Sequence, residues 1–167
     1  MTPGASAQTT YFLDSSALAK RYVAETGTAW TIKLVDPQTN FLIVVAHIGL
    51  VEVAAALASK HRSGVMSTDQ YERALDDLVQ DAGDQYTLVH VTQALVDLAI
   101  DLTRRHKLRG YDAVQLASAL TANSALMAEG FPGLVFVSAD NDLLVAANAE
   151  SLATENPILT FESNLPK

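Results

Sequence analysis

Short apolar runs alternate along this chain with longer segments in which apolar residues recur at helical spacing. Four runs have the length and composition of buried strands: 11–13, 41–45, 86–91 and 134–137. Helical spacing covers the segments between and after them: 17–24, 28–35, 48–62, 69–81, a stretch opened by Thr92, 111–129 and a stretch opened by Asp140. Strands separated by helices predict an α/β fold with a parallel sheet and right-handed crossovers.

Local signals add detail to the ends of these elements. Ser67 begins S-T-D-Q, which predicts a capping box, and Ser15 or Ser16 is suited to cap the first helix. Asn156-Pro157 opens a tail in which we expect a short edge strand over 158–161. The chain length favours one domain. We expect a disordered lead at 1–9, the domain at 10–157 and a C-terminal tail at 158–167.

The first strand ends abruptly in an acid, Asp14, in the stretch YFLDSSAL. Open parallel sheets place their sites at the carboxyl ends of their strands, so this pattern is typical of a site carboxylate. By itself it is equally consistent with Asp14 acting only as a helix cap.

Glu52 lies in IGLVEVAAALA, where apolar residues surround it on every side of the predicted helix. An unpaired buried charge is costly, so Glu52 is either protonated, paired, or directed into a cavity that holds a cation. No basic residue lies within one helical turn. A structural Glu paired with a distant Arg or Lys is the alternative.

Two further acids stand at element ends. Asp112 lies in the first turn of the apolar helix in RGYDAVQLASALTA, where the helix dipole favours an anion whatever its function. Asp140, in VFVSAD, closes a strand and opens a helix as Asp14 does. Asp142, two residues later, is either solvated or auxiliary.

Carboxylates brought together at one sheet edge repel one another unless a cation compensates. Oxygen ligands in a chain without cysteine suit Mg²⁺ or Mn²⁺. The chemistry that fits such a cluster is phosphodiester hydrolysis. The four histidines form no zinc pattern, and the phosphate-loop, dinucleotide-binding and serine-hydrolase motifs are absent.

The net charge of −8 argues against a protein that coats nucleic acid through bulk charge. Eight of the eleven basic residues nevertheless fall into three groups near the acids: Lys20 and Arg21; Lys60 and Arg62; Arg104, Arg105, Lys107 and Arg109. The last group is our candidate RNA-binding set. The alternative is ordinary solvated helix ends.

Two features bear on location. The first residues carry neither Lys nor Arg nor an apolar run, so no signal peptide is predicted. The apolar segment 41–58 contains Glu52 and is interpreted as strand, turn and helix rather than a membrane span. We expect a soluble cytoplasmic protein, which the absence of cysteine also fits.

With these residues in view, the chain resembles the PIN-domain ribonucleases, and among them the VapC-type toxins of toxin–antitoxin pairs. The similarity runs from about residue 10 to 157 and rests on four stretches: YFLDSSALAKRYVAETG, LVEVAAAL, HKLRGYDAVQLASAL and VFVSADNDLLVAA. His47-Ile-Gly49 stands where the family commonly has Ser or Thr before the Glu helix. The lead and tail also make this chain longer than is usual for a free-standing toxin.

The resemblance implies a three-layer α/β/α sandwich with a parallel sheet of four to five strands. It implies an endoribonuclease that uses Mg²⁺ or Mn²⁺, in which Asp14, Glu52, Asp112 and Asp140 are catalytic and bind metal, with Ser15, Ser138 and Asp142 as auxiliary residues. It further implies an RNA substrate, a homodimer, and inhibition by a VapB-type antitoxin on a separate chain. A non-catalytic PIN-like module that binds RNA or a partner is the alternative. A haloacid-dehalogenase-like phosphatase is disfavoured because Ser16 replaces its second Asp.

Overall fold

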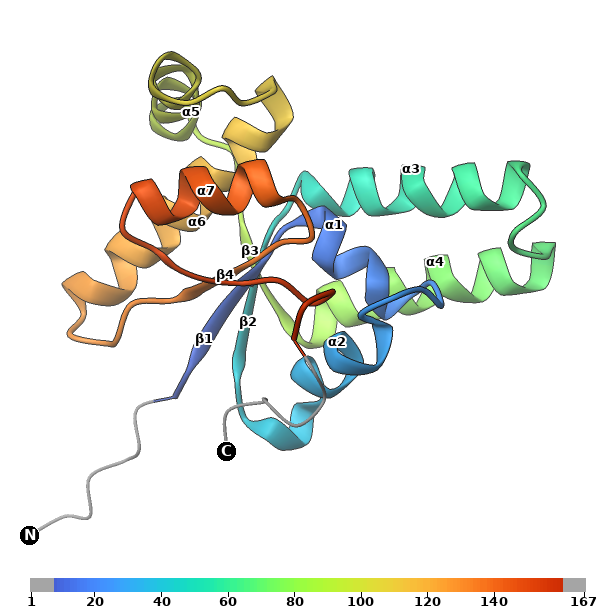
Figure 1. The fold of residues 1–167 in the computed structure, drawn as a ribbon. Coiled ribbons are helices and arrows are strands. Elements are labelled where there is room, and N and C mark those ends of the chain that lie inside the picture. The colour runs from blue at the N-terminus through green and yellow to red at the C-terminus, as the bar shows by residue number, and fades with distance from the viewer. Residues whose placement is uncertain (1–7, 161–167) are drawn as a thin grey trace, which may run out of the picture.

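The computed structural model describes residues 8–160. Its five strands form one parallel sheet in the order β3-β2-β1-β4-β5 (Figure 1). The strands are β1 (Thr10–Leu13), β2 (Leu42–Ala46), β3 (Tyr86–Val89), β4 (Val135–Val137) and β5 (Ala153–Glu155). The predicted α/β fold with a sheet of four to five parallel strands is confirmed.

Helices follow the strands along the chain and lie on both sides of the sheet (Figure 1). They are α1 (Ser15–Leu18), α2 (Thr28–Leu34), α3 (Gly49–Arg62), α4 (Thr68–Asp84), α5 (Gln93–Arg105), α6 (Gly110–Ala128) and α7 (Asn141–Ala149), with short 3-10 turns η1 (Ala19–Arg21) and η2 (Pro37–Thr39). Within residues 8–160, the helices are too short or too polar for any one of them to cross a membrane.

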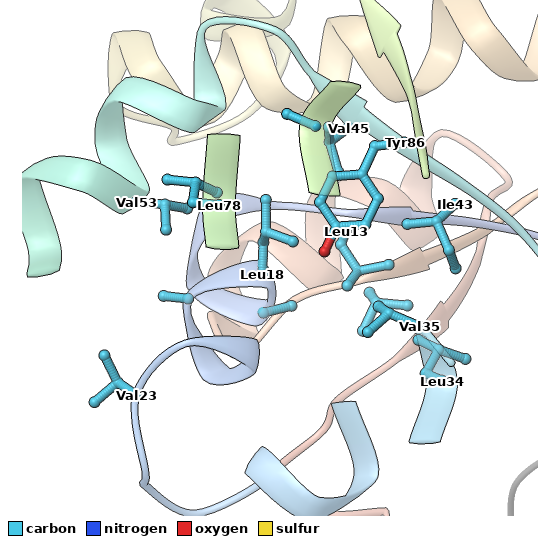
Figure 2. Close-up of a cluster of buried hydrophobic side chains, with 14 of the residues drawn as sticks. Leu13, Leu18, Val23, Leu34, Val35, Ile43, Val45, Val53, Leu78 and Tyr86 are labelled. Atoms are coloured by element: carbon cyan, nitrogen blue, oxygen red, sulfur yellow. The ribbon is translucent and has the colours of Figure 1, made fainter. Parts of the chain in front are cut away.

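Strand side chains alternate between two cores, as the period of two along a strand requires. Leu13 and Val45 belong to the core formed with α1 to α4 (Figure 2). Phe12 and Val44 belong to the core formed with α5, α6 and α7. Phe12 also stacks on Phe136, its register partner in β4, with ring centroids 5.6 Å apart. Both faces of the sheet are therefore covered, which is the predicted three-layer sandwich.

Cap residues fix where several helices begin. Ser67 and Gln70 form the predicted capping box, with bonds of 3.2 and 2.8 Å between each side chain and the other residue's backbone N–H. The first helix differs from the prediction, because neither Ser15 nor Ser16 caps it. Asp14 is the N-cap, since its side chain accepts from the Ala17 N–H at 2.9 Å.

The predicted edge strand at 158–161 is wrong for the described residues. Residues 157–159 form a turn, because Asn156 accepts the N–H of Ile158 through its side chain and that of Leu159 through its carbonyl. The edge strand comes earlier, as β5, and Ala153 pairs with Val135 of β4. Phe161, the rest of the tail and residues 1–7 of the predicted lead lie outside the described residues.

Candidate active site

Parallel pairing brings the ends of β1 and β4 together at one edge of the sheet. Leu13 pairs with Val137, and the Asp14 N–H continues this pairing by donating to the Val137 carbonyl at 3.0 Å. Asp14 directly follows β1, and Asp140 comes three residues after β4 ends. The two strand-end acids of the sequence are thus placed at the same carboxyl edge.

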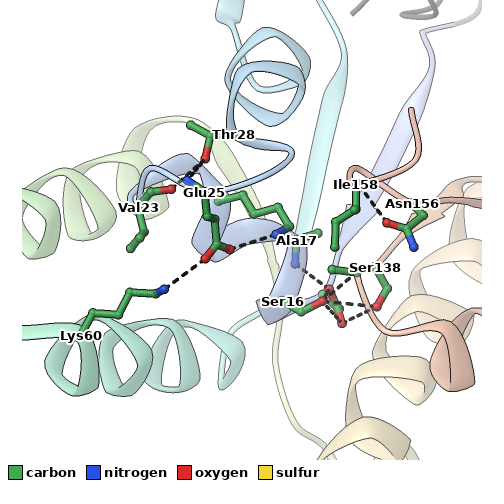
Figure 3. A network of polar contacts seen from close by, with 12 residues as sticks. Ser16, Ala17, Val23, Glu25, Thr28, Lys60, Ser138, Asn156 and Ile158 are labelled. Atoms are coloured by element: carbon green, nitrogen blue, oxygen red, sulfur yellow. Dashed lines mark hydrogen bonds and ion pairs between the residues drawn. The ribbon is translucent and has the colours of Figure 1, made fainter. Parts of the chain in front are cut away.

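Asp14 is held there as a buried carboxylate with only 3% of its surface exposed. The Ser138 hydroxyl donates to its Oδ2 at 2.8 Å, and the Ser16 hydroxyl lies 2.8 and 3.0 Å from its two oxygens. Figure 3 shows Ser16, Ala17 and Ser138 gathered around these bonds. Ser16 also accepts from the Ala139 N–H at 2.9 Å, which joins the start of α1 to the loop before α7.

The electrostatics of Asp14 are unusual for a buried acid. Burial raises its pKa to about 6, and the Glu52 charge acts in the same direction, although the bonds from Ala17, Ser16 and Ser138 oppose the rise. Among residues 8–160, no lysine, arginine or histidine forms an ion pair with it. Neutral donors orient the carboxylate, and no cationic side chain of the described residues compensates its charge.

Glu52 lies in the first turn of α3 and is half-buried. Its apolar neighbours do not enclose Glu52, because the adjacent Val51 is 67% exposed and this side of α3 borders solvent. Ser15 donates its hydroxyl to Glu52 Oε2, which ties the start of α1 to the start of α3. Burial raises the pKa of the Tyr111 hydroxyl to about 12, and the charge of Glu52 acts in the same direction.

Asp112 and Asp140 form a second coupled pair. Burial raises the pKa of Asp112, and the charge of Asp140 raises it further, while the backbone N–H and the charge of Arg109 lower it. Asp140 is exposed and caps α7 by accepting from the Asp142 and Leu143 N–H groups at 2.9 and 3.3 Å. One acid of this pair is half-buried and the other faces solvent.

The four acids therefore couple as two pairs, Asp14 with Glu52 and Asp112 with Asp140. Across the part of the chain that is described, no three carboxylate or imidazole groups are spaced to hold a metal ion as they stand. Metal binding by these acids stays a prediction. The donor set itself fits a hard divalent cation, because it consists of carboxylate oxygens and contains no thiolate.

Gln115, on the same helix as Asp112, contacts Ser15, the partner of Glu52, and was not predicted from the sequence. It lies one turn after Asp112 in α6, is 2% exposed, and its Nε2 is 3.4 Å from the Ser15 hydroxyl. Its Oε1 is buried without a hydrogen-bond partner among residues 8–160. Gly49 lets this side chain approach α3, since a Cβ at Gly49 would lie 2.9 Å from the Gln115 Nε2. This buried amide therefore lies against the starts of both α1 and α3.

Of the predicted auxiliary residues, Ser15 and Ser138 contact the acids directly. Asp142 is exposed and instead lines a separate hollow of about 240 Å³ with His106, Lys107 and others. The sequence analysis also missed Ser16 as a partner of Asp14, because a serine beside a capping position has no distinctive signal.

The basic residues do not all face the site. Lys20 and Lys60 both pair with Glu25, at 2.9 and 3.1 Å (Figure 3), and Arg21 lies 3.6 Å from Asp81. These three basic side chains are therefore directed to acids outside the candidate site. In the candidate RNA-binding set, Arg105 pairs with Asp101 and Glu150. Arg104, Lys107 and Arg109 are exposed.

Comparison with known proteins identifies the class. Residues 11–149 match the family model of the PIN domain. The chain belongs to the PIN-domain family, as its fold and the resemblance of its four acidic stretches indicated.

Within that family its relatives are VapC proteins. Ribonuclease VapC45 of Mycobacterium tuberculosis (strain CDC 1551 / Oshkosh) is 36% identical over 141 residues, which cover 83% of this chain and 89% of the relative. A toxin–antitoxin complex from Klebsiella pneumoniae has a similar fold, with a TM-score of 0.57 at 16% identity, covering 88% of this chain and 97% of that chain. So does Mycobacterium tuberculosis VapC20, a Sarcin-Ricin loop cleaving toxin, with a TM-score of 0.54 at 19% identity over 81% of this chain and 94% of that chain.

Proposed function

We propose that this protein is a metal-dependent endoribonuclease that hydrolyses RNA phosphodiester bonds as the toxin of a toxin–antitoxin pair. The observation that carries the proposal is Asp14, a buried carboxylate without a cation partner among the described residues, at the sheet edge that Glu52, Asp112 and Asp140 also approach. Kinship to a VapC ribonuclease at 36% identity supports the reaction type.

Asp14, Glu52, Asp112 and Asp140 are the residues that would hold Mg²⁺ or Mn²⁺. When bound, such an ion supplies an activated water and compensates charge on the scissile phosphate. The hydroxyls of Ser16 and Ser138 fix the direction of the Asp14 oxygens, and Ser15 does the same for Glu52. Because these donors are positioned before substrate arrives, the carboxylates need little rearrangement during the reaction.

The proposed partners follow from the same kinship. The relative from Klebsiella pneumoniae was solved as a toxin–antitoxin complex, and we infer a VapB-type antitoxin on a separate chain for this protein too. A homodimer in the cytoplasm and contacts of Arg104, Lys107 and Arg109 with RNA phosphates complete the proposal. Arg105, which already pairs with two acids, is the weakest member of that set.

Asp112→Asn tests the reaction directly. Asn keeps the shape of the side chain and some capping ability, so the free energy of unfolding should fall by about 1 kcal/mol or less. Cleavage of total RNA in the presence of Mn²⁺ should fall by about a thousandfold, because a charge that stabilises the transition state is removed. A cleavage assay and a thermal melt of both proteins, with and without Mn²⁺, measure the two effects together.

Asp76→Asn is the matched control, since this acid is exposed on α4 and lies outside the candidate site. It should retain both stability and cleavage. RNase activity that survives Asp112→Asn would end the proposed mechanism. A wild-type protein that binds RNA or the antitoxin but neither Mn²⁺ nor Mg²⁺ would favour the non-catalytic module.

A further inference from the structure

Two histidines lie side by side at the carboxyl edge of the sheet, outside the acidic site. Ala46 of β2 pairs with Val89 of β3, and the His47 N–H continues the pairing by donating to the Val89 carbonyl at 2.9 Å. His47 and His90 are thus register partners one residue beyond the ends of their strands. Their rings meet edge to face with centroids 4.6 Å apart, and both residues are exposed.

Each histidine is followed by an exposed aliphatic residue. Ile48 is 40% exposed and Val91 is 43% exposed, so the two strands leave the sheet as two His–aliphatic pairs. We call these four residues, His47, Ile48, His90 and Val91, the histidine patch. Its flat imidazole rings and apolar flanks have the composition of surfaces on which unpaired bases stack.

The histidine patch and the acidic site lie at the same carboxyl edge of the sheet. Phe12 of β1 pairs with Val44 of β2, and continuing this register sets Asp14 opposite Ala46. Ala46 lies on the neighbouring strand and directly precedes His47. Neighbouring strands are about 4.8 Å apart. On the other side, the Tyr111 hydroxyl donates to the Ile48 carbonyl at 2.5 Å, and Tyr111 directly precedes Asp112.

We propose that the histidine patch binds a nucleobase of single-stranded RNA, stacked on His47 or His90, next to the phosphodiester bond that the acids cleave. The inference rests on the proposed ribonuclease function and adds a base-binding subsite to it. A metal ion is a poorer occupant, because the two imidazoles have no third ligand suitably spaced in the described chain. A stacked base is favoured over a peptide by the exposed aromatic rings and by the link through Tyr111 to Asp112.

The test is a double-mutant cycle between protein side chains and RNA bases. Binding is measured by fluorescence anisotropy with Mn²⁺ present, in an Asp112→Asn background that does not cleave. The probes are a labelled oligouridine and a series in which one base at a time is removed to leave an abasic nucleotide. In the parent protein, one or two abasic positions should weaken binding about tenfold, the factor expected for one lost stack.

His47→Ala/His90→Ala should weaken binding to the intact probe about tenfold and should make binding indifferent to those abasic positions. His47→Phe/His90→Phe keeps an aromatic face and should restore affinity to within about twofold of the parent. The slope of affinity against salt should stay unchanged in all three proteins, because no phosphate contact is removed. His61→Ala is the control, since that ring stacks on Tyr71 away from the sheet edge.

Several results would overturn the proposal. Equal RNA affinity in the double alanine variant removes the subsite, and if binding of the antitoxin is weakened instead, the patch serves a protein partner. Phenylalanine variants that behave like alanine variants show that ring nitrogens, not ring faces, are used. Thermal melts show whether the double alanine variant is folded. If it is not, the same binding measurements are made with His47→Ala and His90→Ala singly. Failure of the wild type to cleave RNA would refute the proposed nuclease independently of these binding results.

Discussion

Asp14 and Asp81 are both buried carboxylates that accept hydroxyl hydrogen bonds, yet their surroundings differ in one respect. Asp81, near the end of α4, is 6% exposed and accepts from the Tyr22 hydroxyl at 2.9 Å and from Gln85 Nε2 at 3.0 Å. Arg21 stands 3.6 Å away as a cation. Asp14 has comparable neutral donors, but the charge that acts on its pKa among the described residues is that of another acid, Glu52.

The difference separates a structural role from a functional one. A buried acid with a cation and a full set of donors is satisfied within the fold, and removing it leaves the donors unpaired. A buried acid beside a second acid is satisfied only when a cation arrives from outside. Asp81 should therefore matter for stability, and Asp14 for chemistry.

The largest expected effect is on cleavage, in Asp14→Asn. We expect RNA hydrolysis to fall by about a thousandfold, because the charge that the serine hydroxyls orient is lost. At about pH 4, where Asp14 is protonated in the folded state, the free energy of unfolding without metal should differ by no more than about 1 kcal/mol, since Asn still accepts the Ala17 N–H. Initial cleavage rates on total RNA and urea melts in EDTA measure both quantities.

Asp81→Asn is the matched variant for this comparison. It should leave the cleavage rate per folded molecule within about twofold and lower the free energy of unfolding by about 2–3 kcal/mol, because the charge facing Arg21 and two further donors is removed. If Asp81→Asn abolishes cleavage in protein that melts normally, the division between the two carboxylates is wrong.

The next effect is the pH dependence of stability without metal. The pKa of Asp14 is about 6 in the folded protein, against an ordinary value of 3.8. The folded state therefore holds the Asp14 proton more tightly than the unfolded state does. The resulting contribution to the free energy of unfolding is fully present below about pH 4 and is lost as pH rises to about 6. Its size is up to about 3 kcal/mol. Asp112, whose pKa is also raised, contributes with the same sign.

Urea melts in EDTA between about pH 4 and pH 7 test this sign, with Asp14→Asn as the control. Relative to the variant, the wild type should lose stability across that window, and added Mn²⁺ should reverse the trend at the upper end. A wild-type profile parallel to that of Asp14→Asn would show that burial of Asp14 does not perturb its titration.

The fold was predictable because its signals are local. YFLD and VFVSAD each indicate a strand by an apolar run that ends in an acid, and Ser67 to Gln70 indicate a helix start. These signals can be read without knowledge of distant contacts. The edge strand was misplaced because β5 is short and half-exposed, and its pairing with Val135 carries no signal in its own three residues. Asn156 and Pro157 end the strand rather than introduce it.

The acids of the candidate site could be proposed from the sequence, whereas the side chains that contact them could not. Asp14, Glu52, Asp112 and Asp140 stand out because a carboxylate in an apolar stretch is costly. Ser16, Gln115 and Tyr111 act through contacts between segments far apart in the chain, as between Gln115 and Ser15. Such contacts depend on how α1, α3 and α6 meet, which periodicity does not describe.

The smallest expected effect sharpens the structural half of the comparison. The Tyr22 hydroxyl lies 2.9 Å from Asp81 and 2.8 Å from the Tyr86 hydroxyl, and burial, followed by Tyr86 and Asp81, raises its pKa, so it remains a donor at neutral pH. Tyr22→Phe removes this donor but leaves Asp81 with Gln85, Arg21 and a longer 3.4 Å contact from Tyr86. The free energy of unfolding should therefore fall by about 1 kcal/mol, less than in Asp81→Asn. In the double variant the two losses should not add, because Tyr22→Phe removes and Asp81→Asn weakens the same hydrogen bond. Urea melts of the wild type, the two single variants and the double variant measure this coupling. Strictly additive losses would show that the stabilising effect of Asp81 does not depend on Tyr22. Cleavage should be unchanged in Tyr22→Phe.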